Sequence, residues 1–156
     1  MSVTAVKEYL AQFNWADKVR ELTVSCATVE LAAAALNTEA ARIAKTLSFK
    51  KEEGCILVVC AGDMKIDNKK FKTTFGVKAK MLTPEEAISM TGHAVGGVCP
   101  FALPQDVAVF LDDSLKRFTT IFPACGSSNS LIELNPDELA MAAKSQNWVD
   151  VCKTRE

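Results

Sequence analysis

Histidine is scarce in this sequence. The chain of 156 residues has a single one, His93, so a serine or cysteine triad has one candidate for its base. The six cysteines are scattered, and no two have the CxxC spacing that structural zinc sites favour. They are Cys26, Cys55, Cys60, Cys99, Cys125 and Cys152. We therefore expect no metal, no cofactor and no disulfide, and thiols that pack as small apolar groups.

Long apolar runs are also missing. The longest, Cys55 to Ala61, has seven residues, whereas a membrane-spanning helix needs about 20. The chain reaches Lys7 and Glu8 without the basic start and apolar stretch of a signal peptide. The phosphate-binding motifs GxxxxGKS/T and GxGxxG and the zinc-protease motif HExxH do not occur. These absences favour a cytoplasmic protein with no membrane partner and a reaction without a cofactor.

The composition is that of one folded domain, covering residues 1–156. Apolar residues make up 49% of the chain and charged residues 24%, which is typical of a globule rather than of a disordered or membrane protein. This length can bury a core without disulfide or metal crosslinks. Helical and strand-like segments alternate without a repeat, a linker or a low-complexity stretch. The pattern predicts a mixed α and β fold.

Capping residues mark the predicted helices. These helices are Thr4 to Phe13, a helix capped by Thr28 that runs to Leu36, a lysine-rich helix from Asp67 to about Gly76, a helix opened by the capping box Thr83 to Glu86 that runs to about Met90, and a helix opened by Asn135 to Glu138. The predicted strands are Ala44 to Phe49, Cys55 to Ala61, Val107 to Leu111, Thr119 to Phe122 and Leu131 to Leu134. The segment 92–104 holds three of the seven glycines and two of the five prolines and should be a loop with unusual backbone angles.

Three features remain as candidates for chemistry. Lys45 stands alone in the apolar segment Ile43 to Leu47, where it lies either on the exposed face of a strand or in a site. The other two are the glycine-rich loop Gly96 to Pro100 and the loop Cys125 to Ser130. His93 and Cys99 share the first loop, so a cysteine hydrolase is conceivable, but their spacing says nothing about orientation.

Positive charge is concentrated in one segment. Residues 65–80 hold six lysines against Asp67 alone, a local charge of +5 in a chain whose net charge is −1. Such a cluster is either a solvated face or a surface that receives phosphates.

The order and spacing of four segments resemble the YbaK/ProX family. They are an alanine-rich helix at Val29 to Leu36, I-A-K-T-L-S-F at Ile43 to Phe49, G-G-V-C-P-F at Gly96 to Phe101, and A-C-G-S-S-N-S-L-I-E-L-N-P-D-E-L at Ala124 to Leu139. Each motif alone is weak, but their combination is fairly specific and spans about Thr23 to Leu139.

The resemblance implies an α+β domain with a mixed, mostly antiparallel sheet surrounded by helices. It also implies a trans-acting enzyme that hydrolyses the ester between a small amino acid, such as Ala or Cys, and the terminal adenosine of a mischarged tRNA, usually tRNA-Pro. The implied catalytic residues are Lys45, Gly96, Gly97 and Pro100. The implied substrate-binding residues are Val98, Cys99, Phe101, Gly126, Ser127, Ser128 and Asn129. Many relatives carry a basic residue after the glycine of the second loop, where this chain has Ser127, which leaves the amino acid open.

The implied partner is the acceptor end of tRNA, and a synthetase is a further candidate partner. We take Lys69, Lys70 and Lys72 as the tRNA-binding residues, since the rest of the chain is acidic. Two alternatives to the deacylase stay open: a cysteine hydrolase of small esters or thioesters, and a non-catalytic module that binds tRNA or a synthetase.

Overall fold

Helices begin where the sequence places their caps. The structure, a computed structural model, describes residues 2–94 and 96–155. The α-helices of this part are α1 (Ser2–Leu10), α2 (Val29–Leu36), α3 (Asn68–Phe75), α4 (Pro84–Thr91) and α5 (Pro136–Ala143). The first ends earlier than predicted and continues as a 3-10 turn to Phe13.

Side-chain caps fix four of these helix starts. Thr83 and Glu86 bond each other's backbone N–H groups in a capping box, and Asn135 and Glu138 do the same at α5. Asp67 accepts bonds from two N–H groups of the first turn of α3, and the Thr28 hydroxyl accepts one, from the Leu31 N–H, at the start of α2. The predicted caps are confirmed because these bonds are local and satisfy donors that every helix start leaves open.

The main sheet has five strands and is mixed. In order across the sheet they are β6 (Phe122–Pro123), β2 (Ile43–Lys51), β3 (Gly54–Ala61), β5 (Ala108–Asp112) and β8 (Asn147–Val149). The hairpin β2–β3 is antiparallel, with an unbroken register from Ala44 opposite Ala61 to Lys51 opposite Gly54. The other three neighbouring pairs are parallel. The α+β class and the mixed sheet are therefore confirmed, but antiparallel pairing does not dominate this sheet, because long connections return the chain in the same direction.

Smaller ladders complete the fold. Strand β1 (Arg20–Glu21) pairs with β7 (Ser130–Leu131), and β4 (Met64–Ile66) pairs with β9 (Cys152–Thr154), both antiparallel. The strands predicted at Thr119 to Phe122 and Leu131 to Leu134 are reduced to two-residue strands and single bridges. Their apolar residues are buried where the chain folds back on itself. A short buried segment of this kind has the same local sequence pattern as a strand.

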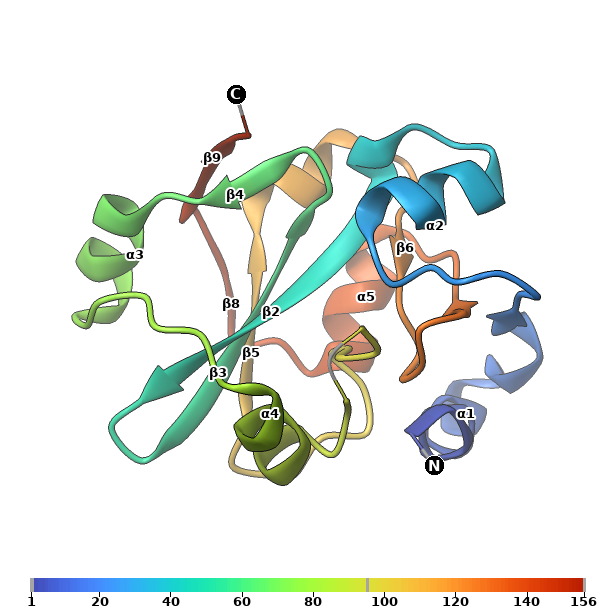
Figure 1. Cartoon of the computed structure of the whole chain (residues 1–156), viewed down its shortest axis with the longest axis horizontal. Helices are drawn as coiled ribbons and strands as arrows, with labels where there is room; N and C mark the ends of the chain where they lie inside the picture. The colour runs from blue at the N-terminus through green and yellow to red at the C-terminus, as the bar shows by residue number, and fades with distance from the viewer. Residues whose placement is uncertain (1, 95, 156) are drawn as a thin grey trace.

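Strand β3 is buried on both faces and separates two apolar cores. Leu57, Val59 and Ala61 face the core that includes α1 and α5, whereas Val58 and Cys60 face the core around α3. Figure 1 shows α3 on one side of the β2–β3 hairpin and α1 and α5 on the other. The same alternation along β2 places Lys45 and Thr46 on opposite faces of the sheet.

No helix of the described residues is long and apolar enough to cross a membrane.

Candidate active site

A cavity of about 300 Å³ lies along the edge of β2. Its walls come from the start of α2, from the segment before α4 and from the glycine-rich loop, and they are mostly apolar. Lys45 and Thr46 line it from β2, Gly96 and Val98 from the loop, and Thr28 from the cap of α2. Three of the predicted site residues, Lys45, Gly96 and Val98, are therefore brought together although they lie up to 53 positions apart.

The outer edge of β2 is open where it borders this cavity. At one end the strand pairs with β6 at Ile43 and Ala44. Toward the other end the Ser48 carbonyl accepts the Leu82 N–H at 3.2 Å, and the Lys50 N–H donates to the Lys80 carbonyl at 2.8 Å. Between these two contacts lies Thr46. Because alternate residues of a strand turn their backbone groups to the same edge, the N–H and C=O of Thr46 point outward, as those of Ser48 and Lys50 do.

Lys45 projects from the opposite face to Thr46. Its side chain is half-buried, and its ammonium donates to the carbonyl of Met64 on β4. Two carboxylates lie within electrostatic reach. Hydrogen bonds from Arg117 are the main cause that lowers the pKa of Asp63, and Lys45 adds to the effect; Glu30 is lowered mainly by its bond to Arg155 and again in part by Lys45. The ammonium is thus held at the cavity rim in a fixed place.

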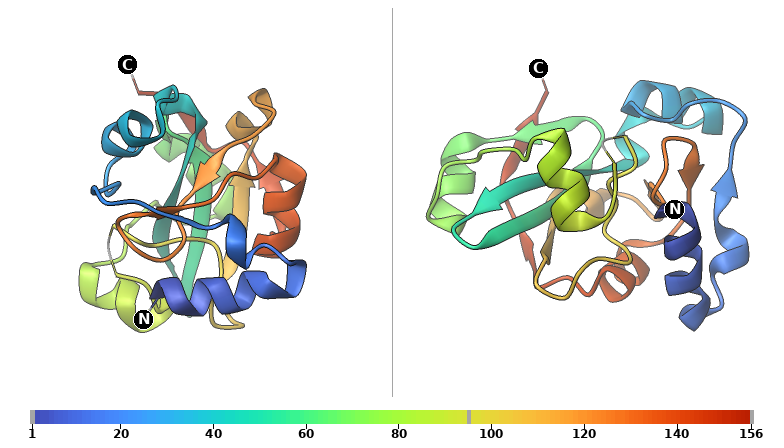
Figure 2. Two further views of the ribbon diagram at one scale, coloured as in Figure 1. Left: turned by 90° about the vertical axis from the view of Figure 1, so that its right-hand side faces the viewer. Right: turned by 60° about the horizontal axis from the view of Figure 1, so that its bottom comes forward.

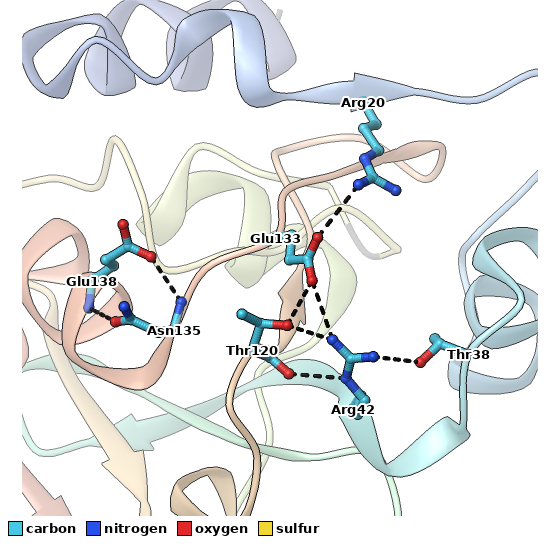
Figure 3. A network of polar contacts seen from close by, with 7 residues as sticks. All are labelled: Arg20, Thr38, Arg42, Thr120, Glu133, Asn135 and Glu138. Atoms are coloured by element: carbon cyan, nitrogen blue, oxygen red, sulfur yellow. Dashed lines mark hydrogen bonds and ion pairs between the residues drawn. The ribbon is translucent and has the colours of Figure 1, made fainter.

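An ion-pair network fixes the start of β2 (Figure 3). The Arg42 guanidinium donates to the Glu133 carboxylate at 3.2 Å and to the Thr120 carbonyl at 3.0 Å. Arg20 reaches the other oxygen of the same carboxylate at 3.4 Å, whereas the Thr120 hydroxyl donates at 2.6 Å to the oxygen that Arg42 binds. Arg42 also lies 5.0 Å from the centre of the Phe122 ring. These contacts fix the position of Arg42, directly before β2, and so fix where the strand that carries Lys45 begins.

The two predicted loops meet backbone to backbone. Gly96 has a φ of +94°, which favours glycine, and its open α-carbon faces Ala27 and Ser128. Gly97 lies so close to Gly126 and Ser127 that a Cβ would approach their backbone atoms to 2.8 Å. The first glycine shapes the cavity wall and the second joins the loops.

The second loop supports the cavity from outside. Ser127 donates a hydrogen bond to the Asn129 side chain at 2.8 Å, and Asn129 in turn donates to the Leu22 carbonyl at 2.8 Å. The Cys26 N–H donates to the Ser128 carbonyl. These bonds hold the segment before α2, which lines the cavity, against the loop 124–130 (Figure 2). Gly126, Ser127, Ser128 and Asn129 do not themselves line the cavity among the residues described.

Cys99, Pro100 and Phe101 lie behind the cavity wall. Cys99 and Phe101 are fully buried, and Phe101 stacks on Tyr9 with ring centres 6.5 Å apart. Pro100 borders a different, smaller hollow of about 250 Å³ beside Tyr9. The structure therefore gives these three a packing position, whereas the sequence resemblance implies contact with substrate or a catalytic role.

His93 and Cys99 are close but do not form a catalytic pair. The Nε2 atom of His93 lies 2.8 Å from the Phe101 carbonyl, which can only accept, so Nε2 carries the proton and cannot take one from Cys99 at 3.5 Å. Burial raises the pKa of the Cys99 thiol to about 12. Burial also lowers the pKa of His93. A protonated thiol away from the cavity disfavours the cysteine-hydrolase reading.

The lysines of α3 divide into two groups. Lys69 and Lys72, together with Lys78 from the segment after the helix, line a second hollow of about 410 Å³. Lys70 instead donates to Asp150 at 2.9 Å and to the Cys152 carbonyl at 3.0 Å, and the bond to Asp150 is the main cause that raises its pKa. The structure thus separates Lys70 from the other two predicted tRNA-binding lysines.

All six cysteines lie in the described part of the chain and are free thiols. Among the residues described, no three histidine, cysteine, aspartate or glutamate side chains gather as metal ligands would.

Sequence reasoning missed several residues of the cavity. Thr46 and Ser48 follow Lys45 on β2, and Met81, Leu82 and Ala87 approach from the segment around the start of α4. The first two had a signal, since a strand that contains a candidate site lysine also presents the residues next to that lysine. The last three had none, because their position depends on how the segment 77–82 docks on the strand edge.

The family model of the aminoacyl-tRNA editing domain matches residues 23–142. The chain belongs to this family. The editing domain so assigned contains Lys45, both loops and the lysines of α3.

The chain is also similar to individual proteins over most of its length. It is 54% identical to YwhH of Bacillus subtilis over the whole of both chains, a protein whose name states no activity. It is 26% identical to a candidate Cys-tRNA(Pro)/Cys-tRNA(Cys) deacylase, EbsC of Enterococcus faecalis, with 90% of this chain and 81% of that one covered. A solved structure named as a candidate trans-editing enzyme for prolyl-tRNA synthetase has a TM-score of 0.88, 30% identity and 97% coverage of both chains. Similarity to proline–tRNA ligases covers about a fifth of their length, for example 20% in Lysinibacillus sphaericus.

Proposed function

We propose that this protein is a trans-acting aminoacyl-tRNA deacylase that hydrolyses the ester of mischarged tRNA, with a small amino acid such as Ala or Cys on tRNA-Pro as substrate. The observation that carries the proposal is the placement of Lys45 on the rim of a mostly apolar cavity, opposite the glycine-rich loop. The family assignment and the relatives named as candidate deacylases support it.

The cavity suits a small acyl group. Its volume of about 300 Å³ is at the lower end for ligand sites, and its walls include Ala44, Ala87 and Val98. Such walls accept a short side chain, and they offer few polar partners for a longer one.

The reaction needs only modest help because an ester is already activated. A water attacks the carbonyl carbon, directly or after a neighbouring ribose hydroxyl has first taken over the acyl group as a new ester. The bond from that carbon to the ribose oxygen breaks, the ribose oxygen takes the proton that the water loses, and free amino acid and uncharged tRNA result. Positive charge and N–H donors near the developing oxyanion lower the barrier. Lys45 supplies the charge in this proposal, either to the ester or to the terminal phosphate.

The partner surface is the basic hollow at α3. Lys69, Lys72 and Lys78 converge there without a carboxylate among the lining residues, so phosphates of the acceptor stem find positive charge. The segment that contributes Lys78 to this hollow continues to Met81 and Leu82, which line the cavity. The same short stretch of chain therefore connects the basic hollow to the cavity. A tRNA end laid along it would bring the 3′ ester to Lys45. The place of such a reaction is the cytoplasm, where charged tRNA is used, and a synthetase that produces the mischarged tRNA is a further partner in this proposal.

A deacylation panel tests the function. Proline tRNA charged with Ala, Cys, Ser, Thr or Pro is incubated with the protein, and the release of the amino acid is compared with the uncatalysed rate. We expect acceleration for one or more small residues and none for Pro. If every ester stays at its uncatalysed rate while the tRNA still binds, the protein is a binding module instead.

A further inference from the structure

The open edge of β2 carries polar groups that the fold leaves without partners. The backbone N–H and C=O of Thr46 face the cavity, and neither has a hydrogen-bond partner among the described residues. The hydroxyl of the same residue is buried and also lacks a partner there. Unpaired backbone groups at a strand edge are a template for pairing, and proteins usually cover them. Here the edge is closed on both sides of Thr46 and open only at the cavity.

We infer that the backbone of Thr46 binds the aminoacyl group of the substrate as if that group were one residue of an added β-strand. This inference rests on the proposed deacylase function. An aminoacyl ester has the repeating unit of a peptide: an amino nitrogen that donates, an α-carbon, and a carbonyl that accepts. The Thr46 carbonyl accepts from the α-ammonium and the Thr46 N–H donates to the ester carbonyl, as in a hydrogen-bonded antiparallel pair.

This pairing also places the amino-acid side chain. Residues directly opposite each other in a ladder point to the same face. The face of Thr46 is that of Val59, its partner on β3. Val98 of the glycine-rich loop packs against the core on this face. The side chain of the substrate therefore lies toward Val98 and Ala87, and the ammonium of Lys45 stays on the other face.

The same N–H takes part in catalysis. When the nucleophile adds to the ester carbon, the carbonyl oxygen becomes an oxyanion, and the Thr46 N–H already points to it. A fixed donor of this kind is worth about 10²–10³ in turnover. The strand edge thus selects an α-amino acid ester and stabilises its transition state with one residue's backbone.

Backbone and side chain can be tested separately. Replacement of the amide at residue 46 by an ester, through insertion of the α-hydroxy analogue of threonine, removes the Thr46 N–H and keeps its side chain; it also weakens the Lys45 carbonyl, which faces β3, as an acceptor. Insertion of threonine by the same method is the control. Thr46→Val removes the hydroxyl and keeps the backbone and shape. We expect the ester variant to lose about 100-fold in turnover on the best charged tRNA. Thr46→Val also changes the cavity wall but keeps the N–H, so its loss should be clearly smaller than that of the ester variant. Thermal unfolding verifies that each variant folds.

Several results would overturn the inference. Full activity of the ester variant would show that the N–H is idle, and an equal loss in Thr46→Val would assign the effect to the side chain.

A second measurement needs no variant: tRNA carrying alanyl is compared with tRNA carrying propionyl, which lacks the amine, and each rate is divided by that of uncatalysed hydrolysis. We expect at least a tenfold smaller acceleration for propionyl, the size of a charged hydrogen bond. Equal acceleration of both esters contradicts the inference but leaves the deacylase function intact. Acceleration of neither ester refutes that function, and binding is then measured directly. The 3′-amide of alanine with adenosine should shift the Thr46 amide resonance, and an unchanged resonance would refute the inference as well.

Discussion

Gly97 packs directly against Gly126. A Cβ on Gly97 would lie 2.8 Å from the Gly126 carbonyl carbon and from the α-carbon of Ser127, closer than real Cβ atoms approach backbone. The two loops that carry the sequence resemblance therefore touch through two residues without side chains, and the position of the cavity wall at Gly96 and Val98 depends on this contact.

Substitution of Gly97 tests this contact. Gly97→Ala should lower the free energy of unfolding by about 1–3 kcal/mol, the usual cost of overpacking, and should also reduce deacylation by shifting the cavity wall. Gly54→Ala is the control. Its φ of +121° also disfavours alanine, but open space surrounds Gly54, which lies at the far end of the β2–β3 hairpin, so this variant adds strain without a loop contact. Thermal unfolding and deacylation are measured for both. Loss of stability without any loss of activity in Gly97→Ala would separate the loop contact from the site.

Lys45 should be dispensable for folding and required for activity. Lys45→Ala removes the charge at the cavity rim and should lower kcat/KM on the order of 100-fold, with the unfolding temperature nearly unchanged because the side chain is half-buried. Lys50→Ala is the matched control on the same strand, where the ammonium pairs with Glu86 at 3.1 Å instead. Near-normal rates in Lys45→Ala would refute its assignment.

The basic hollow should bind tRNA phosphates at specific lysines. The double variant Lys72→Gln/Lys78→Gln should raise KM for charged tRNA and reduce the salt slope of binding by about 1.4–1.8, at 0.7–0.9 per phosphate contact. Lys65→Gln/Lys153→Gln removes the same charge from a directly opposed pair on β4 and β9, outside the hollow. A minimal aminoacyl-adenosine should be cleaved equally by all forms. Equal effects of the two double variants on tRNA would indicate overall charge rather than a site.

Lys70 should behave differently from its neighbours. Because it bonds Asp150 and the Cys152 carbonyl, Lys70→Gln should disturb the contact between α3 and β9 more than it changes tRNA binding. Thermal unfolding and the salt slope of binding distinguish these effects. A slope change as large as that of Lys72→Gln would return Lys70 to the tRNA surface.

Cys99 should destabilise the fold at alkaline pH and should not serve as a nucleophile. Its pKa is raised by burial from 9.0 to about 12, so the folded state favours the neutral thiol. Its stabilising effect is present below about pH 9 and is lost between pH 9 and 12, at about 1.4 kcal/mol per pH unit. Cys99→Ala should flatten the decline of the unfolding free energy with pH, measured by urea titration, and should keep deacylation. Cys26→Ala, at a partly exposed thiol, should change this pH dependence less. Loss of activity in Cys99→Ala with an intact fold would revive the cysteine-hydrolase reading.

The sequence by itself determined the local features of this protein. The capping residues Thr28, Asp67, Thr83 and Asn135 specify helix starts because each bonds N–H groups two or three positions away, within reach of a short stretch of chain. The continuous apolar run of β3 likewise predicts its burial on both faces. The motifs around Lys45 and the two loops were sufficient to place the chain in its family.

Only the tertiary structure decided which of these residues share a cavity. Cys99 and Val98 are neighbours in one motif, yet one is sealed in the core and the other lines the cavity, since successive residues of a loop point in different directions. Lys70 and Lys72 look alike in sequence, but Lys70 is bonded to Asp150 and to the Cys152 carbonyl, which lie near the far end of the chain. The open edge at Thr46 exists because β6 and the segment before α4 cover β2 only on either side of it, and the packing of distant segments is not written in any local pattern.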